Sequence, residues 1–528
     1  MTPLAAQTLP LAVVGALVAG TLLLTWYAAE RNKDTGDHYV AGRRIGGVGN
    51  GLALAGDQIS AASFLGITGA IALTGFSGFW LIVGMPIAYV LVLLLVAEPL
   101  RNLGKFTLAD VIATRFESLG LRASVAIATV IMTIIYMTVQ FIGAGLIAGA
   151  LLDVNFTVAV LVLGVLMTIY TVIGGMVAAT YIQIFKTSLL AVMALAVFVA
   201  VISRTGWNPL GPMLDATESF GTKVVEPDRS DMTESVNSLS LTIGLSLGIM
   251  GLPHVMLRFL TVRDAKAARE SATVAIAIFI AFFLMLPIFG YAALNEIGEK
   301  AIVAANPAGN SAGPMLAQEV GGDILYALVA GVTIATILAV LAGMAIAVSG
   351  AVAHDLYTNV VKKGDVDERG QLISGRLAGA VSAGIAIMLA FGAKNLNIAN
   401  VANIAFAIAA STTMPTLLLT IYWRRFNQVG ALFAMVGGLI VSLALVLLGP
   451  DVLGKDDAIF PLAIPALVSV PAGFLLAYVG TLIGAGRVGS TGMPYDEFER
   501  RAFTPDDEPQ DGSRFTRRAD TPERVGAA

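Results

Sequence analysis

The sequence contains no cysteine, and this absence excludes several kinds of protein at once. Without thiols there is no disulfide framework, no thiol chemistry and no cysteine-based metal site. Histidine is nearly as scarce, because only His38, His254 and His354 occur, far apart and without metal-ligand spacing. We therefore expect neither a haem nor a zinc site in this chain.

Charge is also scarce, at 13% of residues with a net charge of −4. A balance this small gives no reason to expect a nucleic-acid partner. The sequence has no Walker A motif for ATP, no arginine-rich voltage sensor and no ion-selectivity filter. We expect no enzymatic activity, no cofactor and no obligatory protein partner.

Apolar residues are what the sequence has in abundance: they make up 57% of it, and its mean hydropathy is +0.82. They come in blocks of roughly 20, the length that crosses a hydrocarbon core about 30 Å thick. The sequence thus predicts an all-α polytopic protein of the plasma membrane, whose partner is the lipid bilayer. We place thirteen spans near residues 11–29, 50–74, 80–98, 124–150, 156–174, 184–203, 237–252, 270–293, 322–352, 373–392, 398–422, 429–449 and 460–483.

Basic residues fall in alternate loops and predict the orientation. Loops 30–49 and 99–123 carry four each, whereas loop 75–79 carries none. With Arg258 counted among the loop charges of the basic side, the positive-inside rule places the N-terminus outside and the C-terminus in the cytoplasm. That orientation requires an odd number of spans, and thirteen is odd. Residues 485–528 are polar and are predicted to be a disordered cytoplasmic tail after a membrane domain of residues 1–484.

One acid lies inside the second predicted span. Asp57 follows Gly56 and precedes Gln58, Ile59 and Ser60, with Ser63 one turn further. A mid-membrane carboxylate is costly, and it usually marks an ion path, a cavity or a partner. If the helix unwinds here, its carbonyls can bind a cation and its N–H groups an anion. The alternative is a continuous helix in which Asp57 pairs with a neighbouring helix.

The seventh predicted span contains a second break, at Gly248, Gly251 and Pro253. Proline removes a backbone donor, and glycine loosens a helix. Breaks at matching places in two halves are typical of transporters built from inverted repeats, although a simple proline kink is also common. Because the two broken spans are five apart, we predict inverted five-helix repeats at about 50–203 and 237–422.

Further polar residues lie within predicted spans. Thr333 and Thr336 share a helix face and either help to bind a small hard cation or bond to their own helix. Gln140 either faces the cavity or joins helices together. His254 either relays protons or caps a helix near headgroups.

Several stretches together resemble the sodium/solute symporter family, and within it the cation/acetate (monocarboxylate) permeases. They are residues 39–43, 51–66, 97–104, 251–259, 261–265 and 349–357. The resemblance implies a leucine-transporter-like fold of thirteen helices. It also implies a sodium site formed by the carbonyls of Gly56 and Ile59 and by residues Thr336, Ala339 and Val340.

The sequence departs from the family pattern at that site. Ala339 and Val340 stand where the family has adjacent hydroxyl residues, and Tyr181 stands where it usually has an acid. Thr336 is one turn away and can supply an oxygen. These departures leave room for proton coupling through Asp57 or for a rebuilt cation site.

The resemblance implies a symporter that imports short monocarboxylates such as acetate, propionate or pyruvate, with Na⁺ or H⁺ as coupling ion. We expect substrate contacts from Gln58, Ser60, Ser63, Gln140, Gly248 and Gly251. The cation would contact Gly56, Asp57, Ile59, Thr333, Thr336 and Ala339, and Pro253 and His254 would form the gating break. The alternatives are a family member for another solute, such as an amino acid, a sugar or a vitamin, and a membrane sensor or channel.

Overall fold

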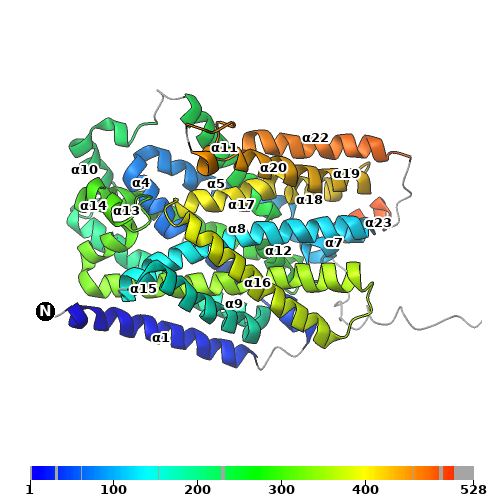
Figure 1. Ribbon diagram of the computed structural model, residues 1–528, viewed down its shortest axis with the longest axis horizontal. Coiled ribbons are helices and arrows are strands. Elements are labelled where there is room, and N and C mark those ends of the chain that lie inside the picture. Colours follow the sequence, from blue (N-terminus) through cyan, green and yellow to red (C-terminus); the bar gives the residue numbers. More distant parts are fainter. Residues whose placement is uncertain are drawn as a thin grey trace, which may run out of the picture.

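The computed structural model describes residues 3–29, 34–60, 62–152, 154–227, 232–454, 456–486 and 492–504, and this part of the chain is almost entirely helical. The long helices run roughly along one axis of the molecule (Figure 1). The α-helices are α1 Pro3–Ala29, α2 Thr35–Val40, α3 Gly47–Gln58, α4 Thr68–Thr74, α5 Trp80–Leu95, α6 Ala97–Leu103, α7 Leu108–Arg115, α8 Leu119–Leu152, α9 Phe156–Arg204, α10 Gly211–Phe220, α11 Met232–Gly248, α12 Pro253–Leu260, α13 Ala265–Glu296, α14 Glu299–Ala305, α15 Ala312–Ser349, α16 Glu368–Ala393, α17 Ile398–Ser411, α18 Thr413–Tyr422, α19 Gln428–Leu432, α20 Gly438–Leu447, α21 Pro450–Leu453, α22 Ala466–Gly484 and α23 Tyr495–Phe503.

Three π-helical segments continue or interrupt these helices: η2 Ala62–Ile67, η6 Gly350–Val361 and η7 Phe433–Gly437. Short 3₁₀ turns fill other junctions, among them η5 Ile249–Gly251. Such irregular turns inside long helices are frequent at functional positions. Two of them, η2 and η5, fall at the predicted breaks.

Ten helical segments of the described chain are long and apolar enough to cross a membrane, or eleven if the bent pair α11 and α12 is one crossing. Part of the difference from thirteen lies in α9. Its first part, Phe156–Met167, counts only as a shorter apolar helix, whereas Gly175–Arg204 counts as a crossing. Gly175, at φ 59° and ψ −170°, is not helical and kinks the chain between the two parts. The chain is thus a multi-pass membrane protein, and thirteen spans remain a prediction.

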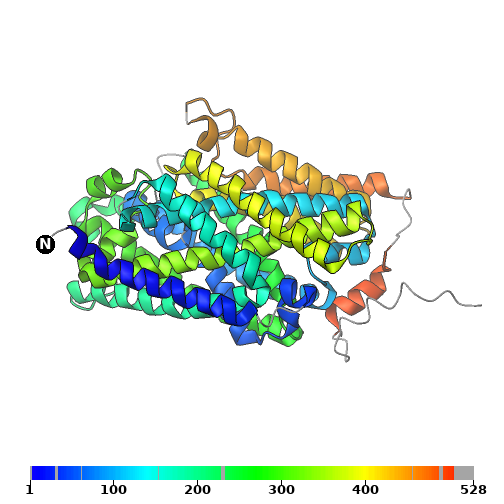
Figure 2. The same cartoon turned by 60° about the horizontal axis from the view of Figure 1, so that its bottom comes forward.

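Helices α8, α15 and α17 form the centre of the bundle and are buried around most of their circumference. Helices α1 and α16 expose most of their apolar surface, as lipid-facing helices do. Figures 1 and 2 both show α1 along the outside of the bundle. Polar residues on the central helices therefore face protein and not lipid.

One part of the predicted disordered tail, residues 492–504, contains a helix, whereas residues 487–491 and 505–528 lie outside the described residues. Tyr495–Phe503 forms α23, whose Phe498 and Ala502 are fully buried. The Nδ2 of Asn102 donates a hydrogen bond of 2.9 Å to the carbonyl of Ala502, and the Arg115 guanidinium lies 4.6 Å from the Tyr495 ring centre. The few apolar residues of this polar region thus suffice to dock one amphipathic helix. It lies at the end of the bundle opposite the start of α1 (Figures 1 and 2).

Candidate functional site

The first predicted break is confirmed at the end of α3. Ile59, with ψ 86°, leaves the helical conformation, and the chain resumes as the π-helix η2. The hydroxyl of Ser63 donates a hydrogen bond of 2.6 Å to the carbonyl of Gln58. This bond satisfies a carbonyl that the helix end leaves without a partner.

The second predicted break is confirmed between α11 and α12, which meet at 40°. After η5, Leu252 is extended, and Pro253 opens α12 where its missing N–H is not needed. A side chain at Gly248 would overlap the carbonyl of Phe406, and one at Gly251 would lie 2.6 Å from the carbonyl of Ala409. Both glycines therefore permit close approach to α17, a role that the sequence did not reveal.

Asp57 forms an ion pair with Arg258 from α12. The Nε of Arg258 donates to Asp57 Oδ2 at 2.6 Å, and both side chains are at most 3% exposed. The guanidinium also donates a bond of 2.8 Å to the hydroxyl of Thr180. Counting Arg258 among the loop charges was therefore wrong, because it is buried and neutralised across the two breaks.

Helix α9 adds two polar groups to this pair that the sequence reading missed. The amide of Gln183 donates to Asp57 Oδ1, and the ammonium of Lys186 donates to the carbonyls of Gly56, at 2.5 Å, and of Thr336, at 3.3 Å. Both side chains are fully buried. Lys186 could have been recognised from the sequence, because a charged residue inside the predicted span 184–203 indicates a buried polar site.

The structure thus brings together two of the predicted cation-site residues, Gly56 on α3 and Thr336 on α15, with Lys186 between them. The hydroxyl of Thr336 has no hydrogen-bond partner among the described residues. Thr333, Ala339 and Val340 are buried along the same helix. They form no hydrogen bond with Lys186 within the described chain.

Buried polar atoms without partners surround the first break. Within the described residues these include both amide atoms of Gln58, the Oε1 of Gln140 and both ring nitrogens of His254. The Nε2 of Gln140 donates a bond of 3.3 Å to Ser60, so two of the predicted substrate residues meet. Unsatisfied buried groups are rare in native proteins and need an explanation.

His254 is buried, and its ring stacks on Tyr136 with centroids 5.3 Å apart. It therefore contacts no headgroups. Tyr136, Ser63 and Asn403 also line a small cavity of about 20 Å³, together with apolar side chains of α5, α11 and α17. The cavity lies next to the first break and next to the aromatic pair.

The family model described as "Sodium:solute symporter family" matches residues 38–438, a stretch that contains both breaks and the Asp57–Arg258 pair. The chain belongs to the sodium:solute symporter family. Its relatives include "Uncharacterized symporter YwcA" of Bacillus subtilis, 42% identical over 89% of this chain and 94% of that protein. Another is the "Monocarboxylic acid transporter" of Corynebacterium glutamicum, 40% identical over 89% of this chain and 90% of that protein.

Solved structures share the fold of this symporter at low sequence identity. A Na⁺-coupled sialic acid symporter in a substrate-bound outward-open state superposes with a TM-score of 0.72 at 15% identity, covering 91% of this chain and 98% of that one. Mhp1, a nucleobase-cation-symport-1 family transporter, superposes with a TM-score of 0.55 at 14% identity, covering 88% and 98%. These likenesses establish the leucine-transporter-like fold.

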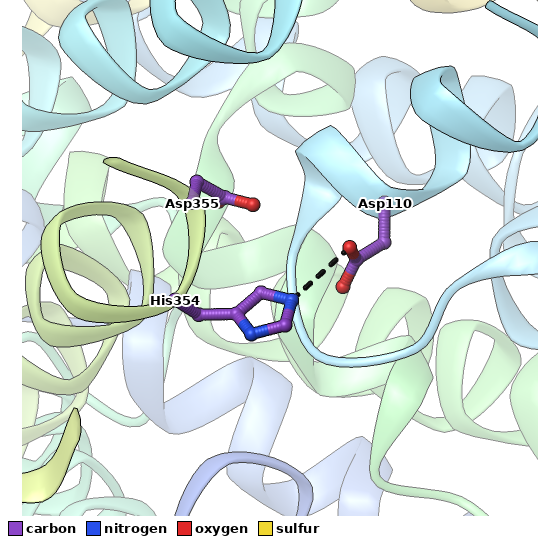
Figure 3. A group of neighbouring side chains, drawn as sticks. All are labelled: Asp110, His354 and Asp355. Carbon is purple, nitrogen blue, oxygen red and sulfur yellow. Dashed lines mark hydrogen bonds and ion pairs between the residues drawn. The ribbon is translucent and has the colours of Figure 1, made fainter. Parts of the chain in front are cut away.

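A second buried charge cluster in this symporter joins α7, α8 and η6. Asp110, His354 and Asp355 point toward one another (Figure 3), and their candidate ligand atoms lie within 4.8 Å. The Nη1 of Arg122 lies 2.7 Å from one carboxylate oxygen of Asp110 and 2.7 Å from one of Asp355. Burial alone would raise the pKa of Asp110, but His354 and Arg122 outweigh it and hold that pKa below its ordinary value. Arg122 thus bridges the two acids and ties the three elements together.

Proposed function

We propose that this family member is a secondary active symporter that imports short-chain monocarboxylates, such as acetate, propionate or pyruvate, coupled to a gradient of Na⁺ or H⁺. Its substrate would bind in the membrane centre between the breaks of α3 and of α11–α12. The relative in Corynebacterium glutamicum whose name specifies monocarboxylic acids supports the substrate class.

The observation that carries this proposal is an excess of positive charge at the breaks. Among the described residues there, two basic side chains, Lys186 and Arg258, lie at the first break together with the carboxylate of Asp57. When both bases are protonated, one positive charge is left over in a place without bulk water. A monocarboxylate substrate carries the single negative charge that would balance it.

The polar groups at the first break are suited to a carboxylate. Gln58, Ser60, Ser63 and Gln140 carry donors, and the Nε2 of Gln58 is a donor without a partner among the described residues. Backbone N–H groups at the break would add donors at a helix end. We assign Gly248 and Gly251 to the wall of this site, where their missing side chains allow α11 and η5 to lie against α17.

The cavity favours a short substrate. Its volume of about 20 Å³ is close to that of one water molecule. A substrate of a few heavy atoms therefore requires less opening than a sugar does. The apolar side chains around Tyr136 would contact its methyl or ethyl group, and His254 and Pro253 would move with the break when the site opens.

Alternating access follows from the same architecture. Rocking of the broken helices against the rest of the bundle would expose the site to one side and then to the other. A co-transported cation would link this motion to the ion gradient. We assign the cation region to Gly56 and Asp57 on α3 and to Ile59 just after it, together with Thr333, Thr336 and Ala339 on α15.

The experiment is uptake of labelled acetate by proteoliposomes that contain the purified protein. Accumulation should collapse when an ionophore dissipates the cation gradients. Unlabelled propionate and pyruvate should compete, whereas proline and glucose should not. Strong inhibition by proline without inhibition by propionate would assign the transporter to another solute, and non-saturating conductance would indicate a channel.

A pair of variants tests the place of the site. Gln140→Leu removes the amide that contacts Ser60 and should raise the KM for acetate by at least several-fold. Gln318→Leu makes the same change on an exposed residue of α15 and should leave the KM unchanged. An equal KM in both variants would place the substrate elsewhere.

A further inference from the structure

We infer that the ammonium group of Lys186 takes the position that a sodium ion would hold between α3 and α15, so that this chain transports its substrate without bound sodium. The inference rests on the proposed transport function and deepens it, because it concerns the cation that the cycle uses. The ammonium of Lys186 contacts both elements that the family pattern expects to hold sodium, α3 and α15.

Lys186 is placed as a bound cation would be. Its Nζ lies 2.5 Å from the carbonyl oxygen of Gly56 and 3.3 Å from that of Thr336. The first carbonyl belongs to the last turn of α3, where the helix break leaves carbonyls without helical partners. A small hard cation prefers the same kind of oxygen.

Two sodium ligands of the family pattern are missing from this position, whereas the Ile59 carbonyl and the Thr336 hydroxyl, which has no partner among the described residues, remain. The resemblance to the family calls for hydroxyl groups one turn beyond Thr336, and Ala339 and Val340 provide none. A sodium ion bound to both carbonyls would have to lie against the ammonium group that already contacts them. Like charges at such a distance repel strongly in a medium that contains little water.

The surroundings of Lys186 also account for a buried ammonium group. The side chain reaches from α9 past Gly56, whose missing Cβ leaves room for Thr187, Gln183 and the Lys186 stem. Burial disfavours a charged lysine, but the ammonium donates to the carbonyls of Gly56 and Thr336, and the carboxylate of Asp57 attracts it. The lysine thus replaces an ion that would otherwise be drawn from solution, and the proton gradient is left to drive uptake.

The decisive experiment uses the native protein in proteoliposomes. Labelled acetate uptake is driven by an imposed pH gradient, with sodium present or fully replaced by choline on both sides. We expect equal initial rates in the two media. A several-fold fall in choline would overturn the inference while leaving the transport function intact. No monocarboxylate uptake in either medium would instead overturn the proposed function.

Sodium binding in a variant gives an independent test. Lys186→Met removes the ammonium and keeps the apolar stem, and Lys300→Met makes the same change on the exposed face of α14. The Tm of purified Lys186→Met should rise with sodium relative to choline, and the additional change Thr336→Val should reduce that rise. The native protein and Lys300→Met should show no such rise.

Folded Lys186→Met without a sodium response would overturn the claim that Lys186 holds a sodium position. A sodium-dependent rise in the native protein would do the same. If Lys186→Met does not fold, the uptake comparison in the native protein still decides.

Discussion

The ion pair between Asp57 and Arg258 should make the two breaks interdependent, and a double-mutant cycle measures this dependence. Asp57→Asn leaves Arg258 and Lys186 as two buried cations without an acid. Removal of one partner of a buried pair costs about 3–5 kcal/mol, because the other charge stays buried and unpaired. Arg258→Met leaves Asp57 with Gln183 and the nearby Lys186, so we expect a loss near the lower end of that range.

The double variant Asp57→Asn with Arg258→Met removes both members of the pair. Its stability loss should be smaller than the sum of the two single losses by about 1–3 kcal/mol, the coupling expected for residues in direct contact. The structural basis is that one guanidinium donates both to the carboxylate and to Thr180. In Asp57→Asn the guanidinium of Arg258 is a buried charge without its acid, so Arg258→Met then removes an unfavourable charge. In the native background the same change breaks a favourable ion pair.

The assay is unfolding by SDS in mixed micelles, followed by far-UV circular dichroism, with retention of the folded protein on gel filtration as a second readout. Arg424→Ala is the control, because it breaks the exposed pair with Asp496, whose side chains are each 70% exposed. Such a pair contributes no more than about 1 kcal/mol. Additive losses in the cycle, or a loss for Arg258→Met no larger than that of the control, would refute the argument.

Three further predictions concern packing and the substrate. Gly248→Ala should reduce the yield of folded protein, because its methyl group would overlap the backbone of α17, whereas Gly392→Ala has open space and should be neutral in the same gel-filtration assay. Phe498→Ala should release α23 and speed cleavage of the C-terminal region in limited proteolysis, and unchanged cleavage would show that this docking is unimportant. Ser60→Ala should raise the KM for acetate and leave the Tm within a few degrees, since its hydroxyl accepts one long bond from Gln140.

The helix breaks could be predicted because their causes are local. Gly56 and an adjacent acid weaken one helix, and Pro253 after Gly251 ends another, so each signal lies within a few residues of its effect. The kink in α9 is also local, because Gly175, which is not helical, lies between the predicted spans 156–174 and 184–203.

The partners of Asp57 could not be predicted for a different reason. Arg258 and Gln183 are 201 and 126 residues away in sequence, and only the packing of α12 and α9 against α3 brings them to the carboxylate. Arg258 follows the break at Pro253 closely, so in the sequence it resembles a loop charge that comes after the end of a membrane span. Lys186 differs from Arg258 and Gln183, because a charge within an apolar segment is a signal that the sequence alone provides.

A side chain differs from a dissolved ion in that its concentration cannot change. A site for a free ion fills in proportion to the salt outside, whereas Lys186 is present once in every molecule and can never diffuse away. The contact that Lys186 makes between the end of α3 and the middle of α15 therefore does not depend on the external salt concentration. In the transport cycle proposed above, no ion would have to bind at this position before the substrate does.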